Sequence, residues 1–183
     1  MKTTKLILAG LTSIALATAC NKQEDATNSS NTETPPKDNP STLEAIFLST
    51  EPKAPMTVLE ARANAEPGQP ITVVGSIGAT ISPFTEGYAT FVLGDDSLDF
   101  CTELPGDHCA TPWDACCEPS NQIADSRLSI QILDDDGKPF PRSLKGVQGL
   151  KELDQVVVTG TVAETSTPEN LLINATGIFK RTL

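Results

Sequence analysis

The sequence predicts a mostly β domain: a five-stranded Greek-key barrel with one short helix before the first strand and another between the third and fourth strands. Three observations support this prediction. Five short segments are apolar and alternating, as half-buried strands are. Turn-forming residues separate them, and the region of about 125 residues that contains them is long enough for one hydrophobic core. The five segments are residues 70–81, 88–93, 127–133, 156–162 and 171–179.

A short helix is predicted immediately before the first strand. Thr57 and Glu60 have the spacing of a capping box, in which the threonine hydroxyl accepts from a first-turn amide and the glutamate reaches back to the backbone. Good helix formers continue to Ala65, and Pro67 ends the helix. In the strand that follows, alternate residues are expected to face the core: Ile71, Val73, Ile77 and Ile81.

The later elements complete the barrel. In the third strand, Leu128, Ile130 and Ile132 alternate with polar residues and are expected to be buried. Residues 134–137, Asp-Asp-Asp-Gly, predict a turn, and residues 144–153 predict a short helix before the fourth strand. Three strands, a helix and two strands are the layout of the OB-fold. Another small β-sandwich is the alternative.

A family resemblance supports this layout. Residues 73–78, 150–162 and 174–178 look like the corresponding segments of secreted bacterial OB-fold proteins. More specifically, Cys109-Ala110-Thr111-Pro112-Trp113-Asp114-Ala115-Cys116-Cys117 is similar to the C-x-T-P-W-D-x-C-C segment of an uncharacterised family of secreted bacterial OB-fold lipoproteins. The resemblance covers residues 57–183. It implies the barrel and an extracytoplasmic location, and it implies no activity.

Residues 1–19 are predicted to be an export signal. Two lysines precede the apolar residues 6–16, a stretch shorter than the roughly 20 residues needed to span a bilayer. The residues before Cys20 resemble the lipobox of bacterial lipoproteins, with Ala17 where leucine is usual. This resemblance implies that Cys20 is lipidated and becomes the mature N-terminus. The alternative is an ordinary signal peptide cut near Ala17-Thr18-Ala19, with Cys20 incidental.

Residues 20–56 are predicted to form a disordered tether. They are rich in Asn, Ser, Thr, Pro and acidic residues, so they bury too little apolar surface to offset chain entropy. Residues 43–48 are more apolar, and a short helical turn that docks on the domain or on a partner is the alternative there; we assign them to the tether. Several acyl chains, palmitate among them, would make attachment to lipid effectively permanent. Asn21 after the cysteine favours the outer membrane, with the domain facing the periplasm.

The charge excludes one class of partner. The chain has 24 acidic and 13 basic residues and a formal net charge of −11, which becomes more negative once the two lysines of the signal are removed. Nucleic-acid binders need clustered lysine and arginine to displace phosphate counterions, and this sequence has no basic run. We therefore expect no nucleic-acid partner.

The cysteines are the strongest local signal. Apart from Cys20, all of them fall within a predicted insertion at residues 94–126, beside the only histidine. Exported proteins occupy an oxidising compartment, so two disulfides that staple this loop are the first interpretation. Adjacent cysteines seldom pair with each other, and the pairing is not readable from sequence. The residues concerned are Cys101, His108, Cys109, Cys116 and Cys117.

Two other functions use the same residues. Thiolates and an imidazole are ligands for Zn²⁺ or Cu(I), which predicts a metal-binding or carrier protein as the alternative. Asp107 and Asp114 could then orient the ligands. A thiol-disulfide oxidoreductase is the weakest hypothesis, because C-x-x-C is missing and the flanking acidic residues raise thiol pKa values.

The only tryptophan, Trp113, is predicted to plug the barrel mouth beneath the loop, or to be a stacking platform for a sugar or base. By analogy with other OB-folds, the ligand surface would comprise Trp113, Tyr88, Gln131 and Asp114. We therefore predict a non-enzymatic, membrane-anchored binding module without a cofactor. Its partners would be membrane lipid through Cys20 and a protein or glycan of the envelope.

Overall fold

The computed structural model describes residues 42–103, 106 and 109–182. The signal, Cys20 and most of the predicted tether lie outside the described residues, as do Asp107 and His108. Among the helices that are described, none has both the length and the apolar character needed to cross a bilayer.

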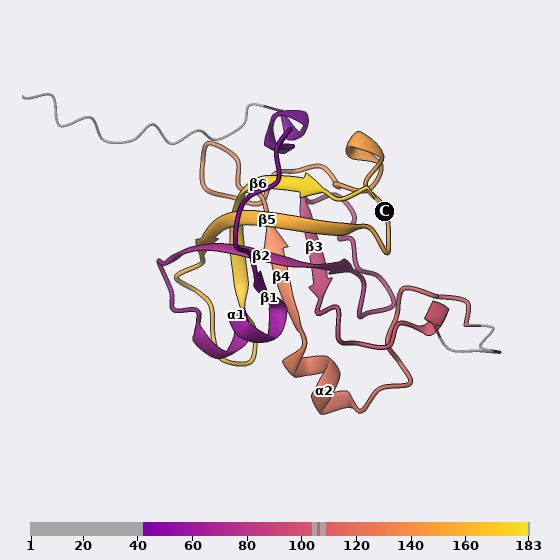
Figure 1. Ribbon diagram of the computed structural model, residues 1–183. Helices are drawn as coiled ribbons and strands as arrows, with labels where there is room; N and C mark the ends of the chain where they lie inside the picture. Colours follow the sequence, from indigo (N-terminus) through magenta and orange to yellow (C-terminus); the bar gives the residue numbers. More distant parts are fainter. Residues whose placement is uncertain (1–41, 104–105, 107–108, 183) are drawn as a thin grey trace, which may run out of the picture. The chain divides into compact units, whose positions relative to one another are not determined.

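The strands form one sheet that closes into a barrel (Figure 1). The sheet order is β1-β2-β3-β4-β6-β5, and a long antiparallel pairing of β2 with β5 closes it. Strands β4 and β6 pair in parallel. Strand β1 is an extra strand that pairs with β2 in parallel over two residues. The other five strands are the predicted OB-fold-like Greek-key barrel. The bounds are β1 (Met56–Thr57), β2 (Pro70–Ile77), β3 (Thr90–Gly94), β4 (Arg127–Gln131), β5 (Gln155–Val162) and β6 (Leu172–Lys180).

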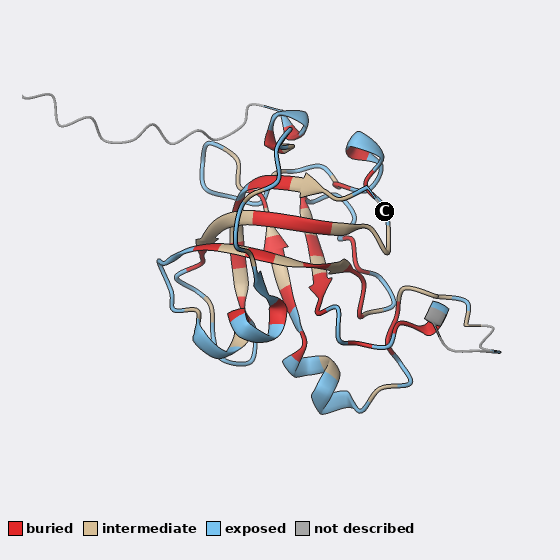
Figure 2. Cartoon of the chain, viewed as in Figure 1, coloured by how far each residue is buried: buried red, intermediate tan, exposed pale blue. Residues whose placement is uncertain are grey.

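The barrel core follows the predicted alternation (Figure 2). Ile71, Val73 and Ile77 of β2 are buried as predicted. Leu128 and Ile130 of β4 are buried too, and so is Ile132, which follows that strand. Ile81 is the exception, because it is 66% exposed instead of buried. The strand ends at Ile77, and Ala79 with φ 58° turns the chain out of the sheet. The prediction of a strand through residue 81 was therefore wrong at its end.

The capped helix before the barrel is confirmed as α1 (Val58–Asn64). The Glu60 N–H donates to the Thr57 hydroxyl at 3.1 Å, and the Thr57 N–H donates to the Glu60 carboxylate at 2.8 Å. Asp95, just beyond β3, accepts from the Leu59 N–H at 2.9 Å. Burial acts to raise the pKa of Asp95, but hydrogen bonds from the backbone of Leu59 and Val58 and from Ser97 outweigh it and leave the pKa lowered. An ionised carboxylate from the barrel thus caps α1.

The helix expected at residues 144–153 is reduced to a single 3-10 turn, η3 (Val147–Gly149). Gly146 and Gly149 have φ values of 85° and 70°, outside the helical region, so a longer helix cannot form across them. A second helix, α2 (Ser120–Asp125), precedes β4 and was not predicted. The turn at residues 134–137 is confirmed by a hydrogen bond from the Gly137 N–H to the Asp134 carbonyl at 3.0 Å.

The folded part begins earlier than the predicted boundary at residue 57. Residues Leu43–Ile46 form the 3-10 turn η1, and both of its end residues are fully buried in the barrel core cluster. The Leu48 N–H then donates to the Ile178 carbonyl of β6 at 2.8 Å. Assigning residues 43–48 to the tether was therefore a mistake. Residues 43–48 are more apolar than the rest of the predicted tether, and the i, i+3 spacing of Leu43 and Ile46 places both on one side of the turn.

Candidate metal centre

The cysteine loop lies between β3 and β4 and has a small apolar core of its own. The buried members of this cluster are Ala79, Leu98, Phe100 and Ala115, and Ile123 and Leu153 pack against them. Trp113 is not a member and is only half-buried. The prediction that Trp113 plugs the barrel beneath the loop was wrong, since Trp113 is half-buried and it is the Phe100 ring that packs against Gly78 and Gly94.

Backbone hydrogen bonds align the two arms of the loop. The Cys101 N–H donates to the Asp114 carbonyl at 2.9 Å, and the Thr102 N–H donates to the Pro112 carbonyl at 3.1 Å. The Asp114 side chain is buried and accepts from the Ala115 N–H at 2.9 Å, directly before Cys116. These contacts hold the first arm, which begins at Cys101, against the arm that leads to Cys116.

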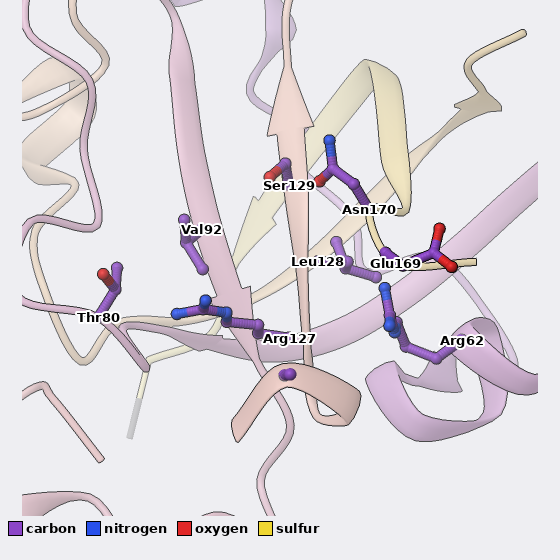
Figure 3. A pocket seen from close by; sticks show the side chains of 9 residues that line it. Arg62, Thr80, Val92, Arg127, Leu128, Ser129, Glu169 and Asn170 are labelled. Atoms are coloured by element: carbon purple, nitrogen blue, oxygen red, sulfur yellow. The ribbon is translucent and has the colours of Figure 1, made fainter. Parts of the chain in front are cut away.

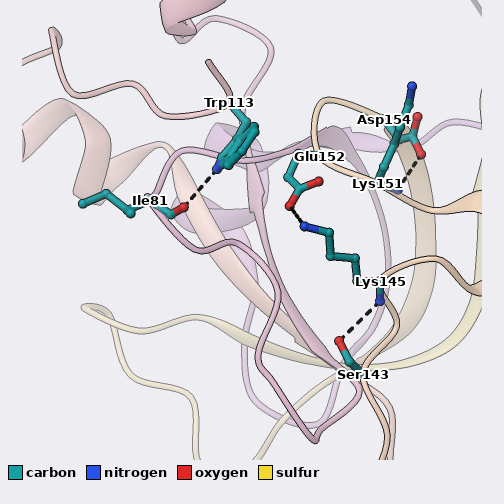
Figure 4. Close-up of polar contacts among 7 residues, drawn as sticks. All are labelled: Ile81, Trp113, Ser143, Lys145, Lys151, Glu152 and Asp154. Atoms are coloured by element: carbon teal, nitrogen blue, oxygen red, sulfur yellow. Dashed lines mark hydrogen bonds and ion pairs between the residues drawn. The ribbon is translucent and has the colours of Figure 1, made fainter. Parts of the chain in front are cut away.

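The loop is also fastened to the barrel. The Ala79 N–H donates to the Trp113 carbonyl at 2.9 Å, and the Trp113 indole N–H donates to the Ile81 carbonyl at 3.0 Å (Figure 4). Gly78 makes this approach possible, because a Cβ added there would lie 2.4 Å from the Trp113 carbonyl oxygen.

The thiols of the loop converge. Cys101 is buried, and the sulfur atoms of Cys101 and Cys116 are 3.6 Å apart. Together with Cys117, these sulfurs all lie within 4.8 Å of one another. A disulfide needs about 2.05 Å, whereas a tetrahedral site with metal–sulfur distances of about 2.3 Å separates its sulfurs by about 3.8 Å. The Cys101–Cys116 separation is therefore close to that of two ligands of one metal ion, and with Cys117 inside the 4.8 Å limit the three sulfurs could hold such an ion.

Cys109 is the fourth thiol of the loop, but it is not one of the three whose sulfurs all lie within 4.8 Å of one another. Its sulfur lies 3.5 Å from the Thr111 hydroxyl. It is half-buried, whereas Cys116 and Cys117 are exposed. Sequence reasoning had named all four cysteines, of which the structure brings Cys101, Cys116 and Cys117 together, but it had not identified Thr111 as a contact of Cys109. The short spacing of Cys109-x-Thr111 was the only signal for it.

The two predicted disulfides do not form in this structure. All four loop cysteines are free, and the sulfurs of Cys101 and Cys116, at 3.6 Å, are beyond bonding distance. The loop is held together instead by the small apolar cluster and by the backbone bonds between its arms. These contacts bring the thiols together without any covalent link, so the predicted staple is not needed to shape the loop.

The thiols crowd one another. Burial, with the Cys116 thiol beside it, raises the pKa of Cys101 to about 11. The Cys101 thiol lowers the pKa of Cys116, but desolvation and the thiols of Cys109 and Cys117 outweigh it and leave that pKa raised. Hydrogen bonds from Thr111 lower the pKa of Cys109. Thiols that raise the pKa of their neighbours disfavour a set of free thiolates, and a bound cation removes this penalty.

The predicted ligand surface is dispersed. Trp113 lines a hollow of about 380 Å³ with Ile81 and Phe84, bordered by the Lys145–Glu152 ion pair (Figure 4). The remaining predicted members do not line it: Tyr88 is 51% exposed, Gln131 donates to Asn174 at 2.7 Å, and Asp114 is buried.

Comparisons with known proteins add no relative, because no protein-family model and no curated protein matches this chain.

Proposed function

We propose that the protein is a lipid-anchored protein of the cell envelope that binds one soft metal ion, Cu(I) or Zn²⁺, through its cysteine loop. The convergence of the Cys101, Cys116 and Cys117 sulfurs within 4.8 Å carries this proposal. Thiolates are the preferred ligands of both ions. The envelope location rests on the signal-like residues 1–19 and on the lipobox-like residues before Cys20.

The exposure of the ligands favours a carrier over a purely structural site. Structural zinc sites are closed by four protein ligands. Here Cys101 is buried, but Cys116 and Cys117 are exposed, so an incoming ligand can reach the metal. The three mutually close sulfurs suit three-coordinate Cu(I), and the addition of Cys109 would complete a tetrahedral zinc site. We propose binding and delivery of the ion, and no catalytic reaction.

A second candidate is a binding module for an envelope protein or glycan. The hollow beside Trp113 supports it, because an aromatic ring, the exposed Ile81 and an ion pair surround one space. Aromatic rings at such places stack on sugars or pack against peptide side chains. The metal proposal has the stronger support, since three thiols lie within 4.8 Å of one another and form no disulfide.

The thiol state of exported protein tests the proposal. Residues 20–183, with Cys20→Ser to prevent lipidation, would be sent to a periplasm behind a cleavable signal. We expect native mass spectra with one metal ion per chain, loss of the ion on denaturation, and four thiols that then react. A variant with all four loop cysteines replaced by serine is the control and should carry no metal. A mass about four units below that of the reduced chain, with no reactive thiol, would mean two disulfides and refute the proposal.

A further inference from the structure

A second hollow lies on the outer side of the barrel, at the start of β4 (Figure 3). It has a volume of about 250 Å³ and is bounded by β3, β4, α1, α2 and the turn before β6. It exists because β4 begins at Arg127, whereas its pairing with β6 begins only at Ser129. The surrounding side chains include Arg62, Thr80, Arg127, Ser129, Glu169 and Asn170.

The arginines of this hollow differ from the others of the folded part. Arg142 and Arg181 form ion pairs with Glu44 and Glu51 at 3.0 Å and 2.6 Å. In the part of the chain that the structure describes, Arg62 and Arg127 form none. The chain has almost twice as many acidic as basic residues, yet its two unpaired arginines line the same space. Glu169 also lines it, beside Arg62 (Figure 3), so that two arginines and one carboxylate border the hollow.

Arg127 is held in place rather than free. Its guanidinium donates to the Ala79 carbonyl at 3.2 Å, and Ala79 is itself fixed in a left-handed conformation by its N–H bond to the Trp113 carbonyl. One donor of Arg127 is thereby used, and the rest of its planar set of donors remains for a ligand. Figure 3 shows Arg127 extending toward Thr80, while Arg62 enters from α1 beside Leu128.

We infer that this hollow binds a small organic carboxylate, of the size of a monosaccharide or smaller. The guanidinium group matches the two oxygens of a carboxylate. The hydroxyls of Thr80 and Ser129 and the amide of Asn170 can bind further polar groups of the ligand. The volume is slightly below that of sites for drug-sized ligands. This inference does not depend on the proposed metal site.

The test is a titration of ¹⁵N-labelled residues 20–183, carrying Cys20→Ser, followed by NMR. The probes are glucuronate, succinate and glucose, which separate the carboxylate from the sugar hydroxyls. Glucuronate and succinate should shift the amide signals of residues 127–129 and 169–170 in a saturable way, and glucose should not. Arg62→Gln and Arg127→Gln should each weaken binding about tenfold or more.

Arg142→Gln is the matched control, since it removes an exposed arginine that is already paired, and it should leave the affinity unchanged. The unfolding midpoint of each variant shows whether the fold is intact, and Arg62→Gln serves as the cleaner variant because Arg127 also holds Ala79. The inference is overturned if neither carboxylate shifts these signals at 10 mM, a concentration on the order of the weakest specific affinities. It is equally overturned if glucose binds as well as glucuronate, or if the three arginine variants behave alike.

Discussion

Replacing Cys101 with serine should lower the affinity for Cu(I) or Zn²⁺ by on the order of a hundredfold or more. Cys101 supplies the buried sulfur of the three that converge, 3.6 Å from the sulfur of Cys116. A serine hydroxyl has nearly the same shape but is a poor ligand for soft ions. Competition against a chromophoric chelator of known affinity measures the effect on reduced protein.

The neighbouring residue provides a matched control for this substitution. Thr102→Val changes an exposed side chain in the same 3-10 turn and removes no thiol, so the metal affinity should stay within about twofold, well below one tenfold step of affinity. Cys109→Ser adds information on ligand number, because it should weaken Zn²⁺ more than Cu(I) if zinc uses four sulfurs. Equal affinities for Cys101→Ser and Thr102→Val would show that the converging thiols are not the ligands.

Gly78→Ala should lower the free energy of unfolding by about 2–3 kcal/mol and weaken metal binding as well. The added methyl group would lie 2.4 Å from the Trp113 carbonyl oxygen and 2.7 Å from the Phe100 ring. Both belong to the contacts that fasten the cysteine loop to the barrel, so the loop must shift and the sulfurs must separate. Chemical denaturation and the chelator competition measure the two effects.

Gly87→Ala is the comparison for Gly78→Ala. Gly87 has φ 75°, and an added Cβ would meet nothing within 4 Å, so only backbone strain of about 1 kcal/mol is introduced. Its metal affinity should equal that of the wild type. If Gly78→Ala matched Gly87→Ala in both stability and affinity, the loop would not depend on its contact with the barrel.

The barrel was predictable from local pattern. Alternation identified the strands, and the Thr57–Glu60 pair identified the first helix, because both signals depend on neighbouring residues. The failures have tertiary causes. Burial of Leu43 depends on contacts of its turn with β6 and η3, which are distant in the chain. The exposure of Ile81 follows from the left-handed Ala79, which the sequence does not mark, since alanine seldom adopts that conformation.

The cysteine group was predictable as a group, but its chemistry was not. Disulfides and metal sites use the same residues, and only the separation of the sulfurs distinguishes them. That separation is set by the packing of Phe100 and by the bond between Cys101 and Asp114, neither of which has a sequence signature. The arginine hollow was missed for a related reason, since Arg62 and Arg127 are far apart in the chain and no motif connects them.

X-ray absorption at the metal edge of the loaded protein tests the central claim most directly. We expect a first shell of three or four sulfurs at about 2.3 Å for zinc, or a comparable sulfur shell of lower coordination for Cu(I). The same spectrum of the variant without the four loop cysteines should lose this shell. A shell of nitrogen and oxygen alone in the wild-type protein would contradict a metal centre built from Cys101, Cys116 and Cys117.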